Sequence, residues 1–304
     1  MIDILLEGIY ILAGLVALMT AITALKDDKH PKRFGTTTFW GLLGFIFIVG
    51  KYLPPVLVGS ILLFMGVLTA TKQVTFGSLQ NSTDEFREKK AMEVGSKIFI
   101  PALSIAVVAF GTAQFTDLGG LVGLGFGAII ATILALTTTK TNPKYVSHDG
   151  SRLLQQVGSA SILPQLLAAL GALFNAAGVG EVISGGISGI IPEGNILAGV
   201  IAYCIGMALF TMIMGNAFAA FAVITAGIGL PFVFAQGADP AIAGIIALTA
   251  GYCGTLMTPM AANFNVVPAA ILETKNKNRV ILSQIPVAGT LLVIHIVLMY
   301  TLAF

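Results

Sequence analysis

Charged residues are scarce in this chain, and one long stretch contains no basic residue. Asp, Glu, Lys and Arg make up 10% of the 304 residues, whereas a soluble domain typically contains about 25%. Between Leu153 and Leu272 there is no lysine, arginine or histidine, and the acidic residues are Glu181, Glu193 and Asp239. Because 56% of the residues are hydrophobic and several apolar runs exceed the roughly 20 residues that cross a bilayer, the composition predicts an all-α polytopic membrane protein.

Other absences exclude classes of function. The sequence has no Walker A motif, so it offers no ATP site of its own. An intramembrane enzyme needs a catalytic pair, but the 153–272 stretch lacks histidine and its three acids are isolated. Cys204 and Cys253, the two cysteines, lie in apolar runs without metal-ligand spacing. We therefore expect no enzymatic activity, no bound cofactor and no nucleic-acid partner.

Hydropathy predicts about nine or ten transmembrane segments. All basic residues except Lys51 lie in four loops between these segments. The positive-inside rule then places the four loops in the cytoplasm and both termini outside a cell (inner) membrane. The predicted segments are 4–25, 36–50, 56–71, 98–115, 118–138, 153–177, 195–213, 217–235, 241–272 and 280–303.

Two of these stretches do not fit a simple helix. The 241–272 run is too long for one perpendicular span, and Thr258, Pro259, Asn263 and Asn265 interrupt it, which predicts a discontinuous helix. The 153–193 stretch is rich in glycine and proline and fits a re-entrant hairpin as well as a span. Irregular backbone is tolerated at membrane depth only where it is buried in protein or lines a cavity.

The character of the chain changes along its length. Residues 1–138 contain smooth apolar segments and are expected to form a scaffold, followed by a cytoplasmic linker over 139–152. Residues 153–272 carry the interruptions and are expected to form a transport core, and 273–304 a last transmembrane helix. Gly119, Gly123 and Gly127 form a small-residue face for close helix packing, within one chain or between copies. His295, an ionisable residue in the last span, is a candidate for proton coupling.

Three groups of neutral polar residues are the candidate sites. The first group precedes Pro164, the second surrounds the Gly215-Asn216 pair, and the third extends from Gly254 to Asn265. Each also has a purely structural interpretation, as a helix cap, an interhelical hydrogen bond or a proline kink. The predicted substrate-binding residues are Gln156, Ser159, Ser161, Asn216, Thr255, Thr258, Asn263 and Asn265, and the predicted ion-binding residues are Gly215, Asn216, Gly254 and Thr258.

The chemistry of interrupted helices indicates what such a site would hold. A half-helix start offers free N–H groups and partial positive charge, which suit a carboxylate. Unwound carbonyl groups suit a sodium ion, the expected coupling ion if one is used. Since the core contains no arginine or lysine, a monocarboxylate or a neutral amide-bearing acid is favoured over a multiply charged solute such as citrate.

Two motifs resemble a known group of transporters. Asp239-Pro240-Ala241-Ile242-Ala243-Gly244, followed by Cys253-Gly254-Thr255-Leu256-Met257-Thr258-Pro259, resembles the second helix-break segment of the ion-transporter superfamily. Gly215-Asn216-Ala217 is similar to another break there, although Ser-Asn-Thr is common at that place. Over nearly its whole length, including Gln155 to Pro164, the chain resembles a bacterial family formerly of unknown function and now assigned as a subunit of a putative 5-oxoproline transporter.

This resemblance implies more than the residues do. It implies a binding core between hairpin tips and broken helices, and an elevator-like movement of the 153–272 core against the 1–138 scaffold. It also implies a second, smaller membrane subunit, and a homodimer is a further expectation. The leading hypothesis is secondary transport of a small organic acid, with 5-oxoproline foremost, coupled to sodium or protons. The alternative is a structural subunit or channel-like component of a two-chain membrane complex.

Overall fold

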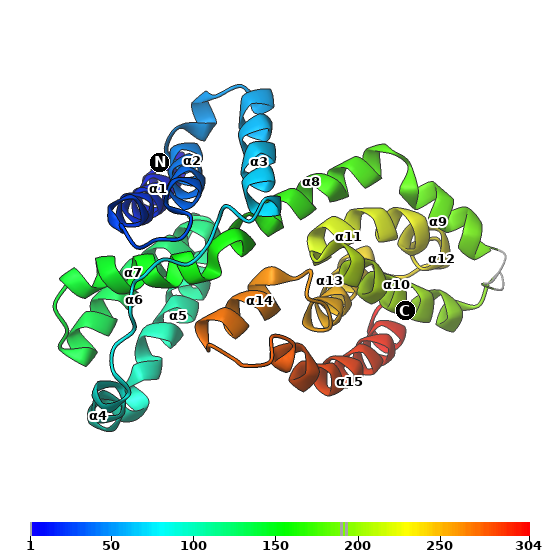
Figure 1. The fold of residues 1–304 in the computed structure, drawn as a ribbon. Helices are drawn as coiled ribbons and strands as arrows, with labels where there is room; N and C mark the ends of the chain where they lie inside the picture. Colours follow the sequence, from blue (N-terminus) through cyan, green and yellow to red (C-terminus); the bar gives the residue numbers. More distant parts are fainter. Residues whose placement is uncertain (1, 189–190, 192–193) are drawn as a thin grey trace. The chain divides into compact units, whose positions relative to one another are not determined.

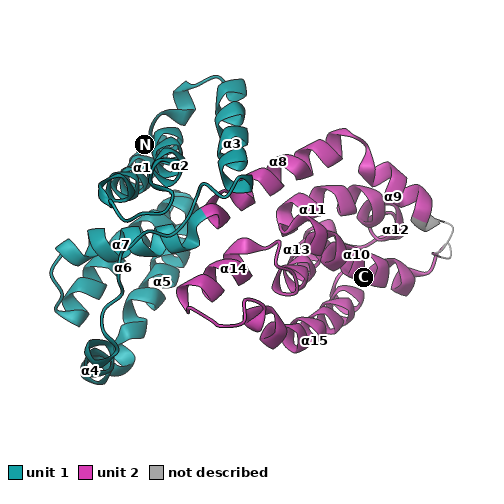
Figure 2. Ribbon diagram, in the orientation of Figure 1, with its two compact units in different colours: residues 1–158 teal, residues 159–304 magenta. Residues whose placement is uncertain are grey.

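The structure, a computed structural model, describes residues 2–188, 191 and 194–304. Throughout these residues the regular structure is helical, without a strand. Eight helical segments in them are long and apolar enough to cross a membrane, and three shorter apolar helices accompany them. The prediction of an all-α polytopic membrane protein is confirmed. The chain forms two compact units, residues 1–158 and 159–304 (Figure 2).

The first unit contains seven α-helices in the described residues, from α1 to α7 (Figure 1). Two pairs of neighbours in the chain, α1 with α2 and α5 with α6, form its most extensive contacts. The helices are α1 Ile2–Lys26, α2 Arg33–Val49, α3 Pro55–Ala70, α4 Asp84–Val94, α5 Phe99–Phe115, α6 Gly119–Thr139 and α7 Lys144–Val157.

Glycines allow both helix pairs to approach closely. A Cβ atom added to Gly14 of α1 would lie 2.8 Å from the carbonyl oxygen of Gly44 in α2. A Cβ atom on Gly123 or Gly127 of α6 would lie 3.0 Å from backbone atoms of α5, whereas one on Gly119 would meet nothing within 4 Å. Small residues at helix contacts are typical of membrane proteins. The sequence left open whether these glycines pack within one chain or between copies. For Gly123 and Gly127, the structure shows packing within one chain.

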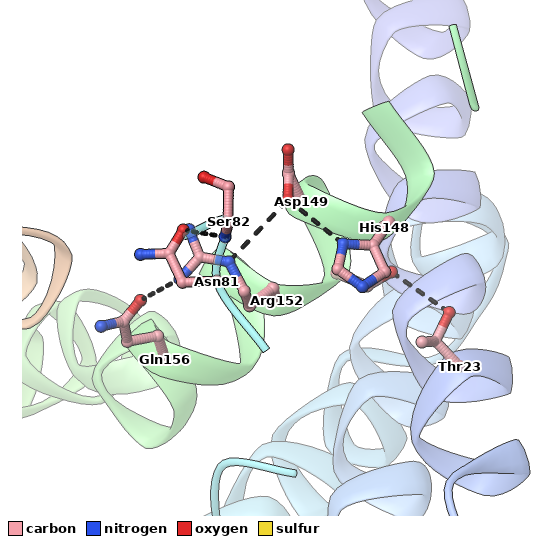
Figure 3. A network of polar contacts seen from close by, with 8 residues as sticks. Thr23, Asn81, Ser82, His148, Asp149, Arg152 and Gln156 are labelled. Atoms are coloured by element: carbon pink, nitrogen blue, oxygen red, sulfur yellow. Dashed lines mark hydrogen bonds and ion pairs between the residues drawn. The ribbon is translucent and has the colours of Figure 1, made fainter. Parts of the chain in front are cut away.

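Helix α7 differs from the predicted linker over 139–152. It is a continuous helix, Lys144–Val157, that contacts α1 and buries Ser151, Arg152 and Gln155. Its His148, Asp149 and Arg152 side chains take part in the polar network of Figure 3. Ser151 Oγ lies 3.2 Å from Thr23 Oγ1 of α1. Hydropathy alone treats such a charged segment as a loop, because the polar face of an amphipathic helix offsets its apolar face when the two are averaged.

An extended segment, residues 71–83, is held against the first unit by side-chain hydrogen bonds. The backbone N–H of Ser78 donates to Asp27 Oδ2 and its hydroxyl to Asp27 Oδ1, both at 2.6 Å. The N–H of Gly77 donates to Gln155 Oε1 at 3.1 Å, and that of Thr75 to Thr36 Oγ1 at 3.1 Å. This segment depends on polar contacts rather than on its own secondary structure.

The second unit contains eight α-helices in the described residues, α8 to α15 (Figure 1). A 3₁₀ turn, Gly158–Ile162, precedes them, and a π-helical turn, Thr225–Gly229, follows α11. The helices are α8 Leu163–Ala176, α9 Val179–Ser188, α10 Ile196–Met214, α11 Ala217–Ile224, α12 Leu230–Phe232, α13 Pro240–Leu256, α14 Ala262–Ile271 and α15 Arg279–Leu302.

Helices α8 and α9 follow the course of residues 217–229. Gly171 of α8 lies against Ala219, and Gly180 of α9 lies against Val223 and Ala226. Both helices thus advance in the same direction as α11 and the π-helical turn. The last part of the 153–193 stretch, residues 189, 190, 192 and 193, lies outside the described residues.

Helices α10 and α13 run in the same direction and pack through small residues. A Cβ atom on Gly251 would lie 2.9 Å from Met207 Cε, and one on Gly254 would lie 2.2 Å from the carbonyl oxygen of Ala208. Further along both helices, the Thr258 hydroxyl after α13 donates to the carbonyl of Met212 in α10 at 2.8 Å. Helix α15 runs the opposite way, since the N–H of Asp239 before α13 bonds the carbonyl of Ala303 after α15 at 2.8 Å. The carboxyl ends of α10 and α13 therefore meet at one end of this unit.

We expect Gly254→Ala to destabilise the second unit, because its methyl group would collide with the backbone of α10. Overpacking of this kind costs about 1–3 kcal/mol. A thermal melt of the detergent-solubilised protein should show a lower midpoint. Gly289→Ala in α15 is the control, since a Cβ atom there meets nothing within 4 Å. Equal midpoints for both variants would contradict the close approach.

The Asp27 contacts predict an acid-sensitive attachment of residues 71–83. Partial burial raises the pKa of Asp27, but hydrogen bonds from Ser78 and Lys29 and the charge of His30 outweigh it and lower that pKa below 3.8. A depressed folded-state pKa stabilises the attachment at neutral pH, and this stabilisation is lost only as pH falls through the lowered value.

Asp27→Asn should therefore release the segment already at neutral pH. Loss of the charge-assisted bonds should speed tryptic cleavage after Lys72 by about tenfold. The ratio of Asp27→Asn cleavage to wild-type cleavage should stay constant across neutral and mildly acidic pH, since the ratio removes the pH dependence of trypsin itself. Asp28→Asn is the matched control, because the Asp28 side chain is 90% exposed and pairs with Arg33. Unchanged cleavage in Asp27→Asn would contradict this role of the carboxylate.

Candidate functional site

The first interruption of the second unit lies between α10 and α11, at Gly215. The φ angle of Gly215 is +67°, and its N–H donates to the carbonyl of Thr211 at 2.7 Å. This left-handed residue ends α10 in the way that glycine ends many helices. A Cβ atom at Gly215 would also lie 2.5 Å from the carbonyl oxygen of Met260. Glycine is thus required both for the turn and for contact with the second interruption.

Asn216 starts the next helix. Its backbone is extended, and its Oδ1 accepts hydrogen bonds from the N–H groups of Phe218 at 2.9 Å and Ala219 at 3.3 Å. These are two of the N–H groups that an uncapped helix leaves unsatisfied. The side chain of Asn216 therefore occupies backbone donors of the kind expected to bind a solute carboxylate.

The second interruption, residues 257–261, separates α13 from α14 as the sequence predicts. Thr258 connects it to the first one. Its hydroxyl donates to the carbonyl of Met212 in α10 at 2.8 Å and accepts from the N–H of Met260 at 3.2 Å. Pro259 has no N–H to satisfy. The two interruptions are thus held together by one buried hydroxyl group.

Asn265 satisfies the end of α13 from inside α14. Its Nδ2 donates to the carbonyls of Thr255 and Thr258, both at 2.7 Å. Its Oδ1 has no partner among the described residues, and neither has Thr211 Oγ1. The two residues are 1% and 0% exposed, respectively. Unpaired buried oxygens are uncommon in proteins and call for an explanation.

A cavity of about 160 Å³ opens where the two interruptions meet. An engineered protein cavity of about 150 Å³ binds benzene, so the space suits one small ring compound. The residues that line it are Pro164, Leu167, Gly215, Asn216, Ala217, Phe218, Tyr252, Thr255, Met260, Ala262, Asn263 and Phe264. All of them belong to the second unit.

The lining is mainly apolar, contains a few polar side chains and carries no formal charge. It includes no Lys, Arg, His, Asp or Glu. Its polar side chains are two amides, Asn216 and Asn263, and two hydroxyls, Tyr252 and Thr255. The Thr255 hydroxyl already donates to the carbonyl of Tyr252 at 2.6 Å. A solute bound here would be held by hydrogen bonds and ring contacts, not by an ion pair.

The structure separates the sequence-predicted residues into three groups. Gly215, Asn216, Thr255 and Asn263 line the cavity, whereas Gly254, Thr258 and Asn265 are buried beside it and hold the two interruptions. The third group is not part of the lining. Gln156 lies in α7 of the first unit, where its Oε1 accepts a hydrogen bond from Arg152 at 3.5 Å. Ser159 and Ser161 lie in the 3₁₀ turn before α8.

Sequence reasoning missed the aromatic part of the lining. Phe218, Tyr252 and Phe264 surround the polar groups, with ring centroids 6.1 Å apart for each of the two neighbouring pairs. Each of these aromatic residues lies within three residues of a predicted site residue. In an apolar sequence, however, nearness to a polar residue does not distinguish a cavity-lining aromatic side chain from a lipid-facing one. His295, the candidate for proton coupling, bonds the carbonyl of Leu291 in its own helix at 2.6 Å and does not line the cavity.

Thr258→Val should weaken the connection between the interruptions. The isosteric change leaves the carbonyl of Met212 and the N–H of Met260 unpaired, which should cost about 1–2 kcal/mol. We expect a lower thermal midpoint in detergent, and Thr258→Ser should restore it because serine keeps the hydroxyl. A Thr258→Val protein as stable as wild type would show that the hydrogen bond contributes nothing.

Comparison with known proteins gives one match. No curated protein and no solved structure matches the chain. Residues 7–304 match the model of a family described as a protein of unknown function, DUF979. Since the match covers almost the whole sequence, the chain, a multi-pass helical membrane protein with an uncharged cavity between two helix interruptions, belongs to the DUF979 family.

Proposed function

We propose that the chain is a secondary active transporter, or a subunit of one, for a small organic acid, with 5-oxoproline as the solute. The observation that carries this proposal is the cavity of about 160 Å³ between the two interruptions, which Thr258 holds together. Helix interruptions inside apolar segments are costly unless they line a cavity or are buried in protein. Binding sites at discontinuous helices are characteristic of secondary transporters.

The lining matches the chemistry of 5-oxoproline, which carries one carboxylate and one lactam amide. The side-chain amides of Asn216 and Asn263 have both donor and acceptor groups. Nδ2 of Asn216 forms no hydrogen bond with the described residues, and neither does the Asn263 side chain. Such amides can pair with the lactam N–H and C=O. The absence of charge in the lining disfavours solutes that carry several charges.

A coupling ion would compensate the charge of the solute. A carboxylate in an uncharged cavity is costly without a nearby cation. The unpaired oxygens Asn265 Oδ1 and Thr211 Oγ1 are neutral ligands of the kind that sodium takes in transporters. Gly215 and Asn216 line the same cavity, while Gly254 and Thr258 lie behind it. Protons remain the second coupling ion to test.

Orientation and assembly are part of the proposal. We place the four basic loops in the cytoplasm and both termini outside the cell membrane by the positive-inside rule. Alternating access would then expose the cavity to each side in turn. A second, smaller membrane subunit, or a second copy of the chain, would complete the carrier.

Uptake of labelled 5-oxoproline into proteoliposomes tests the function directly. The chain is reconstituted with and without its proposed smaller partner, under an imposed sodium or proton gradient. A carrier should show saturable uptake that one of the two gradients accelerates. Flux that does not saturate would support a channel, and uptake that requires only the partner would support a structural subunit.

Asn216 variants test the cavity. Asp and Ser cap helices as well as Asn does, so Asn216→Asp and Asn216→Ser should keep α11 intact while removing the Nδ2 donor. We expect both to lose at least tenfold in uptake, with Asn216→Asp more severe because its carboxylate would repel the solute. Asn175→Ala, an exposed position in α8, is the control. Normal uptake in both Asn216 variants would refute the site.

A further inference from the structure

Few backbone N–H groups at the two helix interruptions are free to bind the carboxylate of the solute. The N–H groups of Phe218 and Ala219, at the start of α11, already donate to Asn216 Oδ1. At the start of α14, the N–H groups of Phe264 and Asn265 donate to the carbonyl of Ala261 at 3.1 Å each. A carboxylate could reach these donors only by displacing existing hydrogen bonds, so side chains must supply most of its binding.

Tyr252 is the lining residue best suited to that role. It lies on α13, one turn before Thr255, and its half-buried side chain lines the cavity. Its hydroxyl forms no hydrogen bond with any described residue. By contrast, the hydroxyl of Tyr203 lies 2.7 Å from Thr225 Oγ1. The Tyr252 hydroxyl is not one of the buried unpaired oxygens of the described residues, so it is an accessible donor beside the cavity that a bound ligand can reach.

The surroundings of Tyr252 fix its ring. Phe218 meets it edge to face, with interplanar angle 87° and centroid separation 6.1 Å. Phe264 lies at the same separation with interplanar angle 50°. Such aromatic contacts stabilise a defined ring orientation. A ring held on two sides presents its hydroxyl with little loss of side-chain entropy on binding, which favours affinity.

We propose that the Tyr252 hydroxyl is a binding residue that donates a hydrogen bond to the carboxylate of the solute. A phenol is protonated at neutral pH and donates one hydrogen bond. Hydrogen bonds from a neutral donor to a carboxylate are short and strong. The amides of Asn216 and Asn263 are then left for the lactam edge. This inference rests on the proposed function and adds to it a residue that determines which acids bind.

The test is Tyr252→Phe, which keeps the ring and both aromatic contacts but removes the hydroxyl. Uptake of labelled 5-oxoproline is measured over a concentration series in proteoliposomes, and thermal stability is measured in detergent. We expect KM to rise about 10- to 100-fold, the range for losing a hydrogen bond to a charged group. The thermal midpoint and the maximal rate should remain close to wild type.

Tyr300→Phe is the matched control, because Tyr300 is 46% exposed on α15 and does not line the cavity. A wild-type KM in Tyr252→Phe overturns the inference but not the proposed function. A fall in thermal midpoint and maximal rate without a change in KM also overturns it, because Tyr252 would then have a purely structural role. No uptake by the wild-type chain, with or without its partner, refutes the proposed function and this inference with it.

Discussion

The hydrogen bond from the Thr258 hydroxyl to the carbonyl of Met212 is the contact on which the candidate site depends. It connects two helix interruptions that are more than 40 residues apart in the chain. In an apolar environment every backbone polar group needs a partner. Thr258, Asn216 and Asn265 supply partners from their side chains. The interruptions are therefore stable structures, and the cavity between them is a consequence of how their backbones are satisfied.

The sequence predicted the existence and position of both interruptions. Gly215 before Asn216, and Thr258 before Pro259, are strong local signals of a helix end, and the structure has helix ends at both places. What the sequence did not reveal is which polar side chain faces the cavity. Asn263 and Asn265 are two residues apart and chemically identical, yet one lines the cavity and the other caps α13. That difference is decided by tertiary contacts.

The remaining differences have physical causes of the same kind. Hydropathy treats a charged segment as a loop, so the amphipathic helix α7 was assigned to a linker, although its polar residues pack against α1. Tyr252 and its two phenylalanine neighbours were overlooked because aromatic residues are common on lipid-facing surfaces, and only the fold shows that these three meet around polar groups. Gln156, Ser159 and Ser161 lie at another helix end, between α7 and α8, and are not part of the lining.

The parallel course of α10 and α13 has an electrostatic consequence. Two helix carboxyl ends, each equivalent to a partial negative charge, meet beside the amino ends of α11 and α14, each equivalent to a partial positive charge. Far from the cavity, the electric fields of these four partial charges largely cancel. A single ion in the surrounding medium is therefore attracted only weakly to this region. Close to the cavity, ends of both signs are present. Under the proposed function, such a field would suit an anionic solute and a coupling cation bound as a neutral pair better than either ion bound alone.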